Sequence, residues 1–320
     1  AAATFLGIVG ILDSTNFLGA AEKLDPYFPN ASPINDDGRG AASIGNPIGF
    51  GVYQAINALL ALSMLLGGER PRRILAIPAL VCSVAVFGSG QIGPVLSFCF
   101  GLAALALLTK STRRLITWAF PFLLVVSIVA VPLAQRRISG LDGVAISSSV
   151  RDGIANIEGP DAGRAFFEAN PGSSWDVRLY NLETYFLPEF AEPANVILGV
   201  TPQARVSSPR DGEDYIWIES GHLWLLWSGG IPLFITWFAL IGVGMWTSRS
   251  TMRNTVGPVG IAAGATFAVL MTVNVAQTFD PHMTLRGTAD VLYPLLALSA
   301  TGLVARRAMK PVTTAPVEVV

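Results

Sequence analysis

The sequence predicts an all-α, multi-pass transmembrane protein with a large extracytoplasmic loop that contains an amphipathic helix. The first reason is composition: 52% of the 320 residues are hydrophobic and only 13% are charged, whereas a soluble domain carries about 25% charged residues. The second reason is a series of apolar runs of nearly the length that a bilayer requires. The third is that basic loops alternate with non-basic ones. The net charge of −1 leaves no basic surplus for nucleic acid, which we exclude as a partner.

The apolar runs predict the membrane helices in order along the chain. A hydrocarbon core of about 30 Å requires roughly 20 apolar residues in a helix. The runs cover residues 1–19, 48–67, 74–88, 92–109, 115–134, 222–246, 256–277 and 291–305. We therefore divide the chain into N-terminal membrane helices (1–134), a large outer loop (135–221), C-terminal membrane helices (222–310) and a tail (311–320). Because the chain begins with Ala rather than Met, we expect it to continue upstream.

Basic residues predict the orientation of these helices. They follow the second, fourth, sixth and last runs: Arg70, Arg72 and Arg73; Lys110, Arg113 and Arg114; Arg249 and Arg253; Arg306, Arg307 and Lys310. Positive charge beside short loops stays in the cytoplasm. We therefore expect residues 20–47, the tight turn near 88–91, and residues 135–221 and 278–290 to face outward.

The outer loop contains one segment with helical periodicity, at residues 173–190. Its apolar residues Trp175, Leu179, Leu182 and Phe186 recur at helical spacing. Ser173 and Asp176 form an N-terminal signal for a helix. We predict an amphipathic helix lying on the outer leaflet, ended by Pro188 and Pro193.

The polar residues able to do chemistry gather on the predicted outer side. The membrane runs are almost free of charge, and charge within the bilayer is the usual mark of an ion or substrate pathway. The candidates lie instead at the outer ends of the runs and in the outer loop: Arg39, Gln91, Trp175, Arg178, Glu219 and His222. This distribution favours a site at the outer membrane boundary over a channel through the bilayer.

Five segments together resemble a known family. They are RGAASIGNPIGFGVYQAINALLAL (39–62), FGSGQIGPVLSFCFGLAALALL (87–108), DVRLYN (176–181), LGV (198–200) and ESGHLWLLWSGGIPLF (219–234). In order and spacing they resemble the superfamily of O-antigen ligases and O-antigen polymerases. The resemblance implies a membrane glycosyltransferase that takes a glycan from a polyprenyl diphosphate carrier on the outer, periplasmic side of the plasma (inner) membrane. It leaves open whether the chain is a ligase or a polymerase.

The resemblance implies roles for three residues at matching positions. Arg39 and Arg178 would bind the diphosphate, because a guanidinium group pairs with phosphate oxygens in a fixed fork. His222 would take the proton of the attacking hydroxyl or position the acceptor, because imidazole changes charge near neutral pH. The implied reaction is a single inverting displacement that uses no metal and no cofactor, with the helix at 173–190 covering the site.

Three further residues complete the predicted substrate site. Glu219 lies three residues before His222 and would orient its ring, and Trp175 would anchor the loop at the interface. Gln91 is a departure from the family, which commonly has Ser-Arg at the turn where this chain has Ser89-Gly90-Gln91. Gln91 donates hydrogen bonds, but it does not neutralise a phosphate.

Two other functions remain open. A flippase or transporter for lipid-linked glycans would also lie in the membrane, but it predicts polar residues along the middle of several helices. A non-catalytic scaffold would bind a partner through the outer loop. For the enzyme we expect three partners: a polyprenyl diphosphate-linked glycan donor, a glycan or lipid–glycan acceptor, and membrane lipids.

Overall fold

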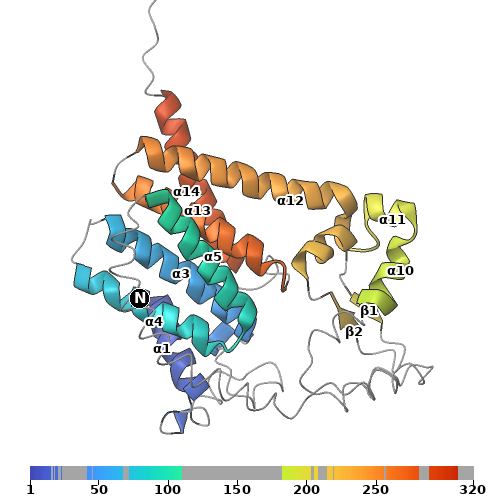
Figure 1. Ribbon diagram of the computed structural model, residues 1–320, viewed down its shortest axis with the longest axis horizontal. Coiled ribbons are helices and arrows are strands. Elements are labelled where there is room, and N and C mark those ends of the chain that lie inside the picture. The colour runs from blue at the N-terminus through green and yellow to red at the C-terminus, as the bar shows by residue number, and fades with distance from the viewer. Residues whose placement is uncertain are drawn as a thin grey trace, which may run out of the picture.

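The structure is a computed structural model that describes residues 1–15, 17, 19, 20, 23, 42–44, 46–67, 72–109, 182–202, 205–207, 215–218, 220–255, 257–280 and 288–308. Helices make up most of this part of the chain (Figure 1). The first group comprises α1 (Ala2–Thr15), the 3₁₀ turn η2 (Ala42–Ile44), α3 (Pro47–Gly67), α4 (Arg72–Gly88) and α5 (Ile92–Thr109).

The second group of elements follows residue 181. It begins with a turn of π-helix, η3 (Leu182–Phe186), followed by α10 (Leu187–Phe190), α11 (Pro193–Leu198), α12 (Gly221–Asn254), α13 (Pro258–Ala276) and α14 (Thr288–Ala308). Two short strands precede α12. β1 (Arg205–Ser207) pairs antiparallel with β2 (Tyr215–Trp217), with Val206 opposite Ile216. With three residues in each strand, this ladder leaves the fold class all-α, as predicted.

The predicted helix positions are largely confirmed. The runs at 48–67, 74–88, 92–109 and 256–277 coincide within two residues at each end with α3, α4, α5 and α13, and the run at 291–305 lies within α14. The run at 222–246 continues to Asn254 in α12, and the first run becomes α1, which ends at Thr15. The run at 115–134 lies outside the described residues.

The beginning of α3 shows how a polar residue sets a helix boundary in this apolar chain. The Asn46 side-chain oxygen accepts hydrogen bonds from the backbone N–H groups of Ile48 at 2.8 Å and Gly49 at 3.3 Å. These are first-turn N–H groups, which have no partner within the helix. Pro47 occupies the first helical position, where its missing N–H costs no hydrogen bond.

In the part of the chain that the structure describes, three helices have the length and composition to cross a membrane, namely α3, α12 and α13. Several helices also expose large apolar side chains. Examples are Ile74 and Ile77 on α4, Phe100 and Leu107 on α5, and Ile235 and Val243 on α12. A water-soluble protein rarely exposes so many large apolar side chains in this way. These features support the prediction of a membrane protein.

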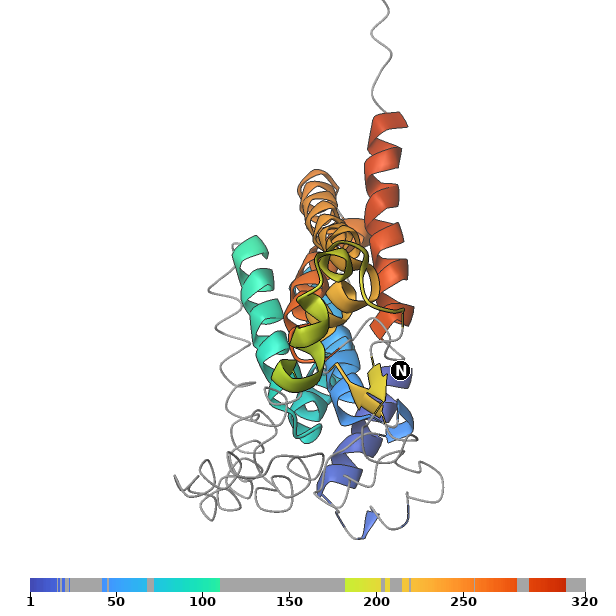
Figure 2. The same ribbon diagram turned by 90° about the vertical axis from the view of Figure 1, so that its right-hand side faces the viewer.

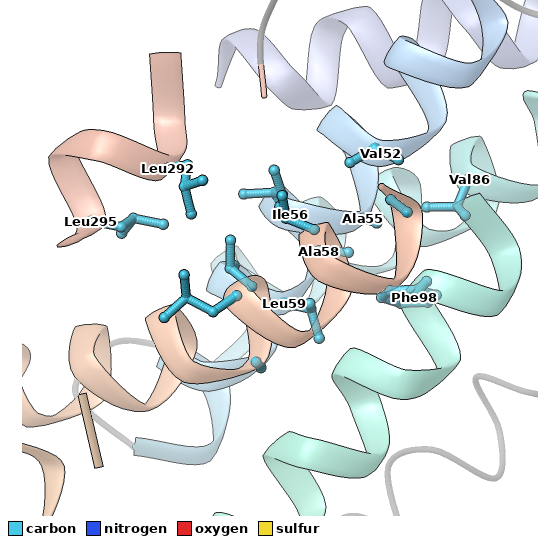
Figure 3. Packing of buried hydrophobic residues seen from close by; sticks show 14 of the residues in the cluster. Val52, Ala55, Ile56, Ala58, Leu59, Val86, Phe98, Leu292 and Leu295 are labelled. Atoms are coloured by element: carbon cyan, nitrogen blue, oxygen red, sulfur yellow. The ribbon is translucent and has the colours of Figure 1, made fainter. Parts of the chain in front are cut away.

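Helix α13 lies at the centre of the bundle and contacts α3, α5, α12 and α14. In Figure 2, α5 and α14 stand on opposite sides of the molecule. The core contains Val52, Ala55, Ile56, Ala58 and Leu59 of α3, packed with Val86 of α4, Phe98 of α5, and Leu292 and Leu295 of α14 (Figure 3). Small residues allow the helices to approach closely. At Gly101 of α5, an added Cβ would meet the Thr272 hydroxyl and lie 2.7 Å from the Leu59 side chain.

The described part of the predicted amphipathic helix agrees with the prediction in its apolar face and differs from it at its two prolines. Residues 173–181 lie outside the described residues, but Leu182 and Phe186 do share an apolar face as predicted, and that face packs on Trp227 of the protein. Pro188 and Pro193 were predicted to end the helix. Instead each lies in the first turn of a new short helix, α10 and α11 respectively, because the first turn is where a residue without an N–H is tolerated.

Candidate active site

Helix α12 folds back on itself near its N-terminus, so the continuous helix predicted at 222–246 is wrong. The backbone leaves the helical region at Gly229 (φ −154°, ψ 17°) and Gly230 (φ 61°, ψ −160°). In an unbroken helix, His222 and Phe238 would lie about 24 Å apart at 1.5 Å per residue, yet their ring centroids are 5.3 Å apart. Residues 221–228 therefore form a short helix that folds back beside the long one. Figure 1 shows this segment out of line with the rest of α12.

The sequence Gly229-Gly230-Ile231-Pro232 explains why the break occurs here. Gly230 has a positive φ with an extended ψ, a combination that is open essentially only to glycine. Pro232 has no backbone N–H, so it fits the first turn of a helix but not its interior. The long helix therefore begins anew just after Gly230, and the short segment is free to take a different direction.

Helix α11 occupies the break. The backbone N–H of Val200, two residues after α11, donates to the carbonyl of Trp227 at 2.7 Å, so one carbonyl that the break frees has a hydrogen-bond partner. A Cβ added at Gly230 would meet the carbonyl of Ile197 and lie 2.8 Å from the nitrogen of Gly199. The two backbones thus approach as closely as glycine permits.

An aromatic cluster anchors α10 to the same short helix. Phe186 and Phe190 both meet Trp227 edge to face, with ring centroids 5.1 Å and 5.5 Å away. This is a favourable geometry for aromatic pairs. Trp227 is almost completely buried, so the α10–α11 segment covers the outside of the fold-back.

The fold-back brings His222 into a half-buried site between α12 and α13. Its ring stacks on Phe238 at an interplanar angle of 23° and presents an edge to Phe234, with centroids 6.5 Å apart. The Nε2 atom lies 3.4 Å from the side-chain oxygen of Asn274, near the end of α13. The same oxygen accepts a hydrogen bond from Nε1 of Trp237 at 3.2 Å.

The N-terminus of the short helix rests on the turn that follows α13. The N–H groups of Gly221 and His222 donate to the carbonyl of Gln277 at 2.7 Å and 3.3 Å. The Gln277 side chain is fully buried against Gly221, and neither its nitrogen nor its oxygen has a hydrogen-bond partner in the described part of the chain. The site thus combines an imidazole and two amides, from residues that an apolar bundle otherwise avoids.

The segment that carries Gln91, between α4 and α5, lies close to this turn. Gln91 lies half-buried after Gly90, whose φ of 62° is positive. Two residues later, a Cβ at Gly93 would lie 3.1 Å from the Phe279 side chain, and Phe279 belongs to the turn that holds His222. The structure therefore brings the segments that carry Gln91 and His222 to the same turn.

The remaining predicted site residues lie outside the described residues. These are Arg39, Trp175, Arg178 and Glu219, so their roles stay predictions. Among the residues that are described, no three His, Cys, Asp or Glu side chains gather as metal ligands would.

Sequence reasoning missed Asn274, which contacts the His222 ring, and Trp237, which bonds to Asn274. It also missed Gln277. One signal was available: Asn274 and Gln277 are amides at the end of the apolar run 256–277, and polar side chains in a membrane helix are costly enough to mark a function. Nothing in the sequence pairs either amide with His222, because the contact spans 52 residues.

The arrangement suits proton transfer by His222. Its ring is held by aromatic contacts and by one nitrogen, and in the described part of the chain no hydrogen bond engages the other nitrogen, Nδ1. A positioned imidazole with a free nitrogen can accept a proton from a hydroxyl that comes within hydrogen-bond reach.

Comparison of the chain with models of protein families, with curated proteins and with solved structures finds no match.

Proposed function

We propose that the chain is a membrane glycosyltransferase that moves a glycan from a polyprenyl diphosphate carrier to an acceptor hydroxyl. The observation that carries the proposal is the placement of His222, half-buried between the broken end of α12 and the end of α13, with Nδ1 free of the described residues. The sequence resemblance to O-antigen ligases and polymerases supports the same reaction, because it singled out this histidine.

In the proposed reaction, the acceptor oxygen attacks the anomeric carbon of the donor sugar. The bond from that carbon to the diphosphate breaks, and polyprenyl diphosphate leaves with the bonding electrons. His222 takes the proton of the attacking hydroxyl. Arg39 and Arg178 neutralise the leaving diphosphate, so the proposed enzyme needs no metal.

The proposed enzyme crosses the plasma membrane several times, with its site on the outer face. The exposed apolar side chains of α4, α5 and α12 suit contact with lipid tails, and the basic residues that follow α12, such as Arg249 and Arg253, suit the cytoplasmic side. His222 contacts Phe238, in the half of α12 away from these basic residues, and this agrees with a polyprenyl-linked donor presented on the outer side.

The test is release of polyprenyl diphosphate by the purified full chain in nanodiscs. The reaction contains a polyprenyl diphosphate-linked glycan, a candidate acceptor and a chelator. We expect release by the wild type, a loss of about a hundredfold or more in His222→Ala, the usual contribution of a general base, and no release by Arg178→Ala. Arg249→Ala, on the predicted cytoplasmic side, is the matched control and should retain full activity.

The other outcomes each contradict part of the proposal. Full activity in His222→Ala would remove the histidine from the chemistry, and loss of wild-type activity on chelation would overturn the metal-independent mechanism. Failure of the folded wild type to release the carrier from any of several donors, while it still binds them, would favour the flippase or the scaffold.

A further inference from the structure

We infer that His222 acts through Nδ1 and that Asn274, oriented by Trp237, is the positioning residue that keeps its Nε2 protonated. This inference rests on the proposed function for its consequence in catalysis. Its structural core, the protonation pattern of the ring, follows from three side chains on α12 and α13 and can be tested without any substrate.

Trp237 identifies which atom of the Asn274 amide faces the site. An indole nitrogen only donates, so the atom 3.2 Å from Nε1 of Trp237 must be an acceptor. The amide oxygen is the acceptor in Asn, and the nitrogen is a donor. The usual ambiguity between the two ends of an amide is therefore removed here by chemistry.

The same oxygen then decides the state of the histidine ring. It lies 3.4 Å from Nε2 of His222, and an amide oxygen carries no hydrogen to share. The contact is favourable only when Nε2 holds the proton. In a neutral imidazole one nitrogen is protonated and the other is not, so Nδ1 carries the lone pair.

Two consecutive residues of α12 fix this arrangement. Trp237 is buried, only 4% exposed, and holds the amide, whereas Phe238 stacks on the imidazole ring and fixes its plane. Both act on His222 only because the break at Gly229 and Gly230 folds the short helix back over them. The fold-back thus delivers a ring whose tautomer and plane are both set.

The consequence for the proposed reaction is a defined path for the proton. The acceptor O–H bond breaks as an N–H bond forms at Nδ1, and the ring becomes an imidazolium. Its Nε2–H then donates to the Asn274 oxygen as a charge-assisted hydrogen bond, which is stronger than the neutral one. Asn274 stabilises the charged ring without exchanging a proton itself.

The test is ¹⁵N NMR of the histidine ring in the full chain. The protein contains only two histidines, so His282→Asn leaves His222 as the single labelled ring in nanodiscs. At a pH where the ring is neutral, we expect a protonated Nε2 and an unprotonated Nδ1. Asn274→Leu should convert this to a mixture of tautomers, whereas Asn274→Asp keeps an oxygen acceptor and should retain the original pattern.

Two further variants keep the test decisive if Asn274→Leu does not fold. Trp237→Phe preserves the bulk of the aromatic side chain but removes the N–H that orients the amide, so it should also give a mixture. Asn254→Leu is the matched control and should leave the spectrum unchanged, because Asn254 is exposed and its side chain bonds to Ser250 of its own helix. A protonated Nδ1 in the wild type, or an unchanged tautomer in both Asn274→Leu and Trp237→Phe, would overturn the inference.

Kinetics separate this inference from the proposed function. We expect Asn274→Leu to lower kcat about ten- to a hundredfold with KM unchanged, as for residues that orient a metal-bound histidine, and Asn274→Asp to recover most of the loss. The expected tautomer in a wild type without transferase activity would overturn the proposed function alone. An active wild type whose Nδ1 is protonated would overturn the inference alone.

Discussion

Helices α12 and α13 are both apolar enough to cross a membrane, and they use their apolar residues in opposite ways. α13 is mostly buried and packs small side chains such as Ala263, Ala265 and Ala268 against its neighbours. α12 is mostly exposed along its long segment, where Ile235, Val243 and Trp246 point away from the bundle. The mean hydropathy of the two helices is similar. Hydropathy therefore does not explain why one helix is buried and the other exposed.

The two helices also differ in continuity, and this difference is where the candidate site arises. α13 runs unbroken from Pro258 to Ala276, whereas α12 breaks at Gly229 and Gly230. The broken end of α12 contacts the end of α13, where the Gln277 carbonyl accepts hydrogen bonds from the N–H groups of Gly221 and His222. An unbroken, buried central helix thus supports the irregular segment that carries the candidate site.

The largest expected effect comes from a substitution that strains the break in α12. Gly230→Ala places a Cβ against the Ile197 carbonyl at a positive φ, so we expect a loss of about 4 kcal/mol in unfolding free energy from strain and overlap together. Denaturant titration in detergent measures it. Gly242→Ala, where a Cβ meets nothing within 4 Å, is the control and should stabilise the helix by about 0.5–1 kcal/mol. Equal effects at the two glycines would contradict the fold-back.

A smaller effect is expected from disturbing the packing of α13. Gly101→Ala brings a Cβ onto the Thr272 hydroxyl of α13 and the Leu59 side chain of α3, which the core accommodates only by shifting. We expect a loss of about 2 kcal/mol, typical of overpacking a dense core. A melting temperature equal to that of the wild type would show that α13 is not the tightly packed centre.

The smallest effect distinguishes a hydrogen bond between helices from one within a helix. Thr251 of α12 donates to the Ser299 carbonyl of α14 at 2.9 Å, whereas Thr236 donates to the Pro232 carbonyl of its own helix at 2.7 Å. We expect Thr251→Val to cost about 0.6 kcal/mol, the average for bonds between membrane helices, and Thr236→Val to cost less. The same titration measures both, and a larger loss at Thr236 would reverse the assignment.

Most of the helical fold was predictable from the sequence, because long apolar runs in a chain with few charges form helices wherever they must hide their backbone polar groups. The break in α12 was not predicted, although its signal, Gly229-Gly230-Ile231-Pro232, is visible in the sequence. Two adjacent glycines permit a break but do not require one. Whether they break the helix depends on a partner that fits the gap, and here that partner is α11.

The candidate site was predictable only in part, for the same reason. His222 stands out in the sequence because it begins an apolar run and because it matches the resembled family. Asn274 stands out only as a polar side chain in an apolar run, and nothing in the sequence identifies it or Trp237 as a partner of His222. Their contact with His222 exists only after the chain has folded back.

The sequence by itself determined that this is a helical membrane protein, where most of its helices lie, and that His222 is a candidate for chemistry. These follow from local properties: hydropathy over about 20 residues, and the rarity of titratable side chains in apolar runs. The tertiary structure alone decided that α13 is central and α12 peripheral, that α12 doubles back at Gly230, and that Asn274 meets the imidazole. Packing and hydrogen bonding between segments far apart in the chain select one arrangement among the many that the same local preferences allow.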